Sequence, residues 1–180
     1  MTAVGQVSYS WPQYEDLERR LADTIADSGW EFDQIVGIAR GGMFIADCLS
    51  RIFDKPIALT VASSYKNKTQ KELVLSKEVA MATDRIGQRI LLVDDMVDSG
   101  TSLEQTKQFL REKFSHITEI RTAVLFRKSG TNFAPDYFVE DIDKKTWIVQ
   151  PFEKFDQVRL ALLPTGVADS RVSHNDSNLK

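Results

Sequence analysis

The 180-residue sequence predicts an α/β fold built on an open, mainly parallel twisted sheet flanked by helices. Two segments carry this prediction, residues 34–62 and 89–126. Each passes from a short apolar run through a turn of small residues into a helical pattern, and then into another apolar run. Such βαβ units have right-handed crossovers and place their strands parallel. We therefore expect a parallel sheet with helices on its faces and a small addition near the C-terminus.

Hydrophobic periodicity and turn residues set the order of the elements. Ser10 suits the cap of a first helix, Pro12 its first turn, and apolar residues then recur at helical spacing. Segment 63–71 (SSYKNKTQK) is polar and basic without an apolar period, so we expect an exposed loop. The expected elements are a helix up to Gly29, strands 34–39 and 57–62 around helix 43–53, strands 73–75 and 89–93, helix 102–114, strand 120–126, and short strands 137–139 and 147–149.

Composition and charge narrow the class of protein. A length of 180 residues with 42% hydrophobic residues fits one domain, which we place over 1–163, followed by a disordered tail over 164–180. The net charge of -3 argues against binding to nucleic acid or to an anionic membrane. One cysteine and two histidines exclude a disulfide framework and a Cys/His zinc site. Without a signal sequence or a long apolar run, we expect a cytoplasmic protein with no integral membrane contact.

The segment ILLVDDMVDSGTS carries the most chemical information. An apolar strand ends, three carboxylates follow within five positions, and a turn rich in hydroxyls leads into a helix. Ligands of open α/β sheets bind beyond the carboxyl ends of the strands, and the amides at a helix start suit a phosphate. Asp94 and Asp95 suit a diol, a hydrated magnesium ion or one of each. The alternative is that these aspartates are solvated turn residues. Three aspartates directly beside this hydroxyl-rich turn favour a ligand-binding site instead. The candidate residues are Asp94, Asp95, Asp98, Ser99, Gly100, Thr101 and Ser102.

VDDMVDSGTS resembles the phosphoribosyl-diphosphate-binding motif of the type I phosphoribosyltransferases. That motif has two acidic residues, two apolar-leaning residues, and then Asp-Thr/Ser-Gly with further hydroxyl or small residues. Segment 35–42 (IVGIARGG) is similar to the family's pyrophosphate loop, in which Arg40 and the Gly41 amide would meet the diphosphate. The resemblance covers 35–151. It implies the type I phosphoribosyltransferase fold, with a small base-binding hood over about 128–163.

Within this family, the bacterial xanthine-guanine enzymes match most closely. SSYKNKTQKEL resembles their flexible lid, with Lys71 at the place of an arginine. Lys128 stands where a lysine of these enzymes bonds O6 of the base, and DYFVEDIDKKTWIVQPF resembles their purine-binding end. The resemblance implies that Trp147 stacks on the base and that the backbone of Ile148 contacts its 2-position edge. A solvated basic loop and a buried core tryptophan are the structural alternatives. Val149 departs from the relatives' glutamate.

The resemblance implies Mg²⁺-dependent transfer of phosphoribosyl from 5-phospho-α-D-ribose 1-diphosphate to a 6-oxopurine (guanine, xanthine or hypoxanthine), as in purine salvage. The products would be a nucleoside 5'-monophosphate and pyrophosphate. Asp98 would be the catalytic base at N7 of the purine. Asp94 and Asp95 would hold the ribose diol, with Asp95 touching magnesium, while Arg40 and Lys71 would neutralise the pyrophosphate. The family also implies a homodimer or homotetramer, and no nucleic-acid partner is expected.

Two other functions stay open at this stage. The first is a phosphoribosyltransferase for another base, such as adenine, uracil or orotate, which Lys128 and the TWI segment disfavour. The second is a non-catalytic, nucleotide-sensing RNA-binding regulator on the same fold, which the net charge of -3 disfavours. We interpret Cys48 as a core residue rather than a nucleophile, because no histidine lies near it in sequence.

Overall fold

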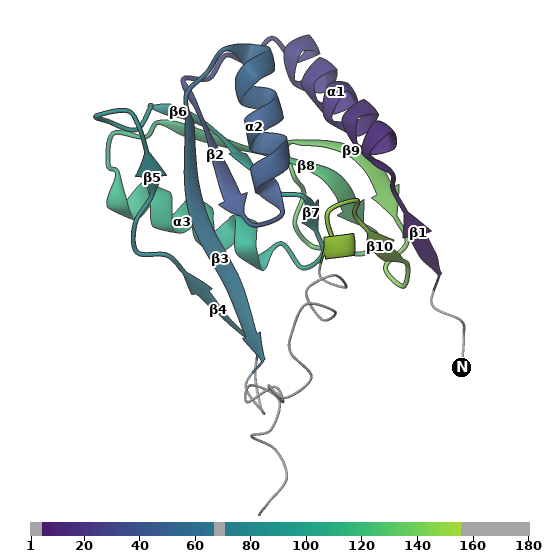
Figure 1. Cartoon of the computed structure of the whole chain (residues 1–180). Coiled ribbons are helices and arrows are strands. Elements are labelled where there is room, and N and C mark those ends of the chain that lie inside the picture. The colour runs from purple at the N-terminus through teal and green to yellow at the C-terminus, as the bar shows by residue number, and fades with distance from the viewer. Residues whose placement is uncertain (1–4, 67–70, 156–180) are drawn as a thin grey trace, which may run out of the picture.

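The computed structural model describes residues 5–66 and 71–155 (Figure 1). The expected tail over 164–180 and the last part of the expected domain lie outside these residues. No helix among the described residues is long and apolar enough to cross a membrane. In chain order the elements are β1 (Gln6–Ser8), α1 (Trp11–Asp27), β2 (Gln34–Ala39), α2 (Gly42–Phe53), β3 (Ile57–Lys66), β4 (Lys71–Leu75), β5 (Ala80–Met81), β6 (Arg89–Val93), β7 (Met96–Val97), α3 (Thr101–Lys113), β8 (Glu119–Lys128), β9 (Tyr137–Ile142) and β10 (Trp147–Val149).

The main sheet is mixed but mostly parallel, as the sequence predicts. Its strands follow the order β4-β3-β2-β6-β8-β7, with β5 paired to β3 and β9 paired to β8. Strands β2, β3, β6 and β8 run parallel, as do β7 and β9 against β8. Strands β4 and β5 run antiparallel to β3. A separate two-stranded parallel sheet joins β1 to β10.

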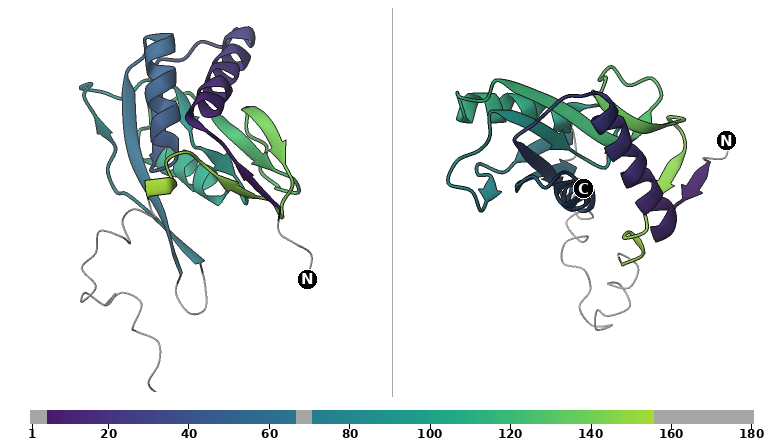
Figure 2. Two further views of the ribbon diagram at one scale, coloured as in Figure 1. Left: turned by 45° about the vertical axis from the view of Figure 1, so that its right-hand side comes forward. Right: turned by 90° about the horizontal axis from the view of Figure 1, so that it is seen from above.

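Helices cover both faces of the main sheet (Figures 1 and 2). Alternate side chains of β6 point to opposite faces, as the geometry of a strand requires. Leu91 and Val93 pack in the cluster that includes α1 and α2, whereas Ile90 and Leu92 pack in the cluster that includes α3. The hydrophobic run of β6 therefore reflects burial on both faces, the pattern typical of a central parallel strand.

The first helix begins where the sequence predicts. The backbone N–H of Ser10 donates to Oε1 of Gln13 at 2.9 Å, which satisfies a group at the helix start. The apolar residues at helical spacing are buried, and the helix ends at Asp27, shortly before Gly29 with φ 65°. The buried residues with this spacing are Tyr14, Leu17, Leu21 and Ile25.

The prediction of a loop over 63–71 is wrong at both ends. Strand β3 runs on to Lys66, and β4 begins at Lys71, which pairs with Lys66 across an antiparallel hairpin. Residues 67–70 lie outside the described part of the chain. Figure 1 shows the two strands projecting beyond the main sheet. Backbone pairing extends both strands into the polar segment, where the sequence has no hydrophobic period that would predict them.

Glu18 and Cys48 meet between α1 and α2. Glu18 is buried, and its carboxylate accepts a hydrogen bond from the Cys48 thiol. Burial raises the pKa of Glu18 from 4.5 to about 7 and that of half-buried Cys48 from 9.0 to about 12. Because a nucleophilic cysteine needs its thiolate form, this environment fits a packing role for Cys48.

Replacing Glu18 by Gln should flatten part of the pH dependence of stability. The folded-state pKa of Glu18 lies above its unfolded value, so its protonation favours the folded state. This contribution is fully present below about pH 4.5 and is lost as the pH rises through about 7. The free energy of unfolding of the wild type, relative to Glu18→Gln, should fall between pH 5 and pH 8 in urea titrations. Glu104→Gln, at an exposed position of α3, is the control. Parallel profiles for wild type and Glu18→Gln would contradict the assignment.

Candidate functional site

Two loops that lie far apart in sequence touch at the carboxyl end of the sheet. Strand β2 ends at Ala39 and β6 at Val93, and the two strands are parallel neighbours. A Cβ atom at Gly41 would lie 2.4 Å from Cγ of Asp95, and one at Gly42 would lie 2.5 Å from the Val93 carbonyl oxygen. Only glycine permits this approach. The Arg40–Gly41 loop, whose Ala39–Arg40 peptide is cis, therefore lies against the aspartate loop.

Asp95 is held by its backbone and by both carboxylate oxygens. Its carbonyl oxygen accepts a hydrogen bond from the Leu125 N–H at 3.1 Å, which ties it to β8. Oδ1 accepts from the Met96 N–H at 2.9 Å, and Oδ2 accepts from Nε2 of Gln150. Gln150 follows β10, so the C-terminal hood reaches the aspartate loop through this contact.

Asp94 and Asp95 interact strongly as neighbouring acids. Oδ1 of Asp94 accepts a hydrogen bond from the Asp95 N–H at 2.9 Å, and the Asp94 N–H donates to the Ala123 carbonyl at 3.1 Å. Burial, followed by the nearby Asp95 carboxylate, raises the pKa of Asp94 well above its ordinary value of 3.8. A cation beside this pair would favour the ionised form of Asp94.

The start of α3 forms a small cavity of about 220 Å³ lined by residues 94–103. The hydroxyl oxygens of Ser99 and Thr101 lie 2.9 Å apart, and the Thr101 N–H donates to Ser99 Oγ at 3.3 Å. Asp98 is exposed beside them. Gly100 has φ 83°, a left-handed conformation that suits glycine and leads the loop into the first turn of α3. Hydroxyls and helix-start amides surround one small space here, which suits a phosphate.

A larger cleft of about 590 Å³ joins both loops to the hood. It brings Arg40 and Asp95 together with Trp147. The Trp147 side chain is 63% exposed, which rules out a buried core tryptophan, whereas Ile148 is buried in the core. The lining residues are Arg40, Gly41, Phe44, Asp95, Trp147, Gln150, Phe152, Glu153 and Phe155.

Of the two lysines singled out in the sequence, Lys128 does not line this cleft, and the side chain of Lys71 is not described. Lys128 is 6% exposed, and its ammonium group donates to the Thr146 carbonyl oxygen. It lines a separate cavity of about 500 Å³ that includes the loop after β8. Lys71 begins β4 at the end of the hairpin, and its side chain lies outside the described part of the structure. The roles expected for these lysines stay predictions.

Comparison with known proteins identifies the family. The family model described as "Phosphoribosyl transferase domain" matches residues 9–155. The chain belongs to this phosphoribosyltransferase family. It is therefore an enzyme of the glycosyltransferase type. The family resemblance and the fold class predicted from the sequence are both confirmed.

Individual relatives cover most of the phosphoribosyltransferase chain. It is 32% identical over 146 residues to a xanthine-guanine phosphoribosyltransferase of Idiomarina loihiensis, covering 80% of this chain and 84% of the relative. It is 29% identical over 155 residues to one of Desulfotalea psychrophila, covering 86% and 90%. The solved xanthine-guanine-hypoxanthine phosphoribosyltransferase of Helicobacter pylori superposes with a TM-score of 0.72 at 26% identity, covering 87% of this chain and 98% of that one.

The donor atoms of the site fit a magnesium ion that also binds substrate. Among residues 5–66 and 71–155, no group of three or more His, Cys, Asp or Glu side chains is arranged to hold a metal ion. Asp95 lines the cleft, and Asp94 and Asp95 both line the smaller cavity at the start of α3. Magnesium typically uses one or two carboxylates and completes its shell with water and substrate phosphates. The aspartate pair of this phosphoribosyltransferase fits that mode and does not fit a dedicated all-protein cage.

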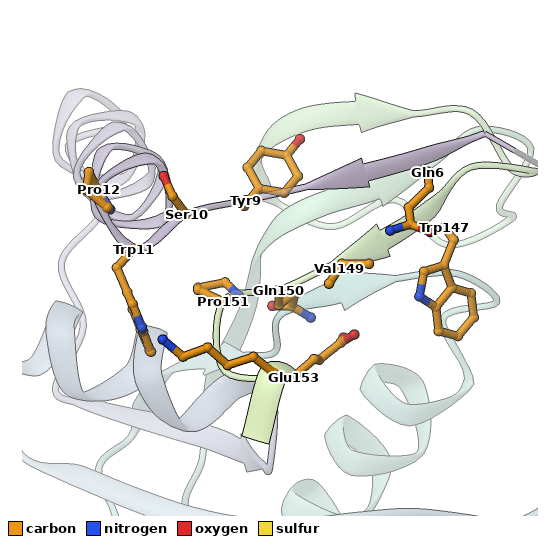
Figure 3. Close-up of a pocket in the computed structure, with 11 residues that line it drawn as sticks. Gln6, Tyr9, Ser10, Trp11, Pro12, Trp147, Val149, Gln150, Pro151 and Glu153 are labelled. Atoms are coloured by element: carbon orange, nitrogen blue, oxygen red, sulfur yellow. The ribbon is translucent and has the colours of Figure 1, made fainter. Parts of the chain in front are cut away.

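Sequence reasoning missed Gln150 and Tyr14. The buried hydroxyl of Tyr14 on α1 donates to Oε1 of Gln150 at 3.1 Å. Burial, and next the charge of Asp95, raises the pKa of Tyr14, so its hydroxyl stays a donor. Gln150 also lines a groove of about 720 Å³ with Trp147 and Trp11, shown in Figure 3. The Gln-Pro pair of the hood segment was the available signal, but a single polar residue does not reveal a partner 55 positions away.

Replacing Gly100 by Ala should destabilise the phosphoribosyltransferase more than replacing Gly130. Both glycines have positive φ, 83° and 77°, so a side chain at either costs about 1–2 kcal/mol of strain. A Cβ at Gly100 would lie 2.1 Å from Cβ of Phe133, whereas one at Gly130 meets nothing within 4 Å. We expect Gly100→Ala to lose the larger free energy of unfolding in urea titrations. Equal losses would show that the loop does not depend on its contact with Phe133.

Proposed function

We propose that the protein catalyses Mg²⁺-dependent transfer of phosphoribosyl from 5-phospho-α-D-ribose 1-diphosphate to a 6-oxopurine, as in purine salvage. The observation that supports this best is the cleft in which Arg40, Asp95 and exposed Trp147 meet beside the start of α3. The residues that we propose for the anion, the ribose diol and the base thus line one region. The relatives named as xanthine-guanine phosphoribosyltransferases support the choice of acceptor.

The donor substrate would bind across the two loops, with each of its parts facing different residues. The amides and hydroxyls at residues 98–102 would bind the 5-phosphate, as helix starts bind anions. Asp94 and Asp95 would hold the ribose diol. Arg40 and the Gly41 amide would face the diphosphate, with Lys71 joining from the hairpin. A magnesium ion bound at Asp95 would supply positive charge against the pyrophosphate leaving group.

The purine would occupy the hood side of the cleft. The indole of Trp147 is exposed there and would stack on the base, with the backbone of Ile148 at its 2-position edge. Lys128 already donates to the Thr146 carbonyl. An ammonium group has three donors, so Lys128 can keep that bond and also donate to O6. Asp98 would accept the N7 proton as the purine becomes nucleophilic.

A panel of acceptor bases tests the proposed reaction. With the donor and Mg²⁺ present, guanine, xanthine and hypoxanthine should each release pyrophosphate, whereas adenine, uracil and orotate should release none above background. Chelation of Mg²⁺ should abolish the signal, and added Mg²⁺ should restore it. Turnover with adenine alone, or with a pyrimidine alone, would show that the acceptor is not a 6-oxopurine. No turnover with any base, together with RNA binding at moderate salt, would indicate a regulator.

Replacing Asp98 by Asn should separate turnover from donor binding. A general base contributes about 10²- to 10⁴-fold to rate, so kcat should fall by that order. The Kd for the donor, measured by calorimetry with Mg²⁺, should change less, because the amide keeps the shape of the loop. Asp23→Asn, on the exposed side of α1, is the control and should leave both values unchanged. Equal losses in kcat and donor affinity would rule out the general-base role of Asp98.

A further inference from the structure

A chain of three side chains connects helix α1 to the cleft. The hydroxyl of Tyr14 donates to Oε1 of Gln150 at 3.1 Å, and Nε2 of Gln150 donates to Oδ2 of Asp95. Tyr14 is 0% exposed and Gln150 is 3% exposed, so the bond between them is buried, and the bond from Gln150 to Asp95 is part-buried at the cleft. A buried polar group that loses its hydrogen-bond partner destabilises the folded state. Each of these hydrogen bonds therefore restrains the two side chains that form it.

Asp95 and Tyr14 each bond one end of the Gln150 amide. A glutamine amide has an accepting oxygen and a donating NH₂ group, and a flip would exchange them. The Tyr14 hydroxyl donates to the oxygen, which leaves the NH₂ group toward the Asp95 carboxylate. The flipped amide would place its oxygen against the carboxylate and lose the bond to Asp95, so the carboxylate selects this orientation and the Tyr14 hydroxyl anchors the opposite end.

Gln150 restrains the terminal side-chain torsion of Asp95, which sets the plane of the carboxylate. The Asp95 backbone is tied to β8 through Leu125, and Oδ1 is bonded to the Met96 N–H. The terminal torsion of an aspartate is broad, so the carboxylate plane needs a second point of attachment. Gln150 provides it at Oδ2, and the close approach of Gly41 limits movement on the side of the Arg40–Gly41 loop.

We propose that Gln150, anchored by Tyr14, is a positioning residue that holds the Asp95 carboxylate in the orientation that binds the magnesium complex of the donor. This role rests on the proposed function, in which Asp95 contacts magnesium and the ribose diol. A neutral amide suits this task, because it fixes the carboxylate without cancelling the charge that attracts the cation. A lysine or arginine at this place would compete with magnesium for the same oxygens.

Donor affinity distinguishes positioning from a purely structural role. Gln150→Met keeps an unbranched side chain of similar length but removes the donor. Partners that orient metal ligands typically contribute about 10- to 100-fold to metal affinity. We expect Gln150→Met to raise the calorimetric Kd for the Mg²⁺–donor complex by that order, and Tyr14→Phe to raise it by a smaller factor. The KM for guanine should change less than twofold for both variants.

Tyr9→Phe is the matched control for Tyr14→Phe. Tyr9 donates its hydroxyl to Oε2 of Glu140 at 2.7 Å, a bond from the N-terminal segment to β9 that does not include Asp95. Tyr9→Phe should therefore lose a side-chain hydrogen bond and leave the Kd for the Mg²⁺–donor complex within twofold. If all three variants weaken donor binding equally, or if KM for guanine rises as much as the donor Kd, the positioning role is wrong.

A double-mutant cycle tests the contact without any ligand. The shifts in urea midpoint caused by Gln150→Met and Asp95→Ala should be non-additive in the free protein, because each variant removes the hydrogen bond between these two side chains. Additive shifts would overturn the proposal even in an active enzyme. If the wild type binds no donor, the proposed function fails and the role of Gln150 in it fails too. Non-additive midpoints would in that case still establish the contact, so the two failures are distinguishable.

Discussion

The position of the Asp95 carboxylate is the constraint on which the candidate site depends. The Arg40–Gly41 loop, the aspartate loop and the residues after β10 all meet at this group. Gly41 leaves too little room for any side chain beside the carboxylate. A larger residue at that place would push the two loops apart. Such a shift would move Arg40 relative to Asp95 and Trp147, which line the same cleft.

The parallel sheet explains why these loops meet at all. Strands β2, β6 and β8 run in one direction, so their carboxyl ends open at one edge. Loops from separate βαβ units therefore converge there, which is the general basis of ligand sites in open α/β sheets. Helix α3 starts at this same edge and aims its first amides into the cavity beside the aspartates. Burial of β6 on both faces keeps that edge in place.

Elements with a strong local pattern were predictable, and elements that depend on distant partners were not. The boundaries of β2, β6 and β10 match the apolar runs in the sequence. Strand β1 has three exposed residues and exists because it pairs with β10, about 140 positions later. The β3–β4 hairpin extends into a polar, basic segment because backbone pairing stabilises it there. Strand β1 and the polar parts of β3 and β4 have no hydrophobic period, so no local property distinguishes them from a loop.

The sequence by itself determined the family, the mainly parallel sheet and the two loops that form the candidate site, because βαβ periodicity and the aspartate motif are local. The tertiary structure decided how these loops are held. Gln150 and Tyr14 belong to different elements and carry no motif, yet their hydrogen bonds fix the orientation of Asp95. The exposure of Trp147 and the bond from Lys128 to the Thr146 carbonyl were also decided by packing. A buried polar contact depends on which side chains the fold brings together, and residue spacing along the chain does not record that.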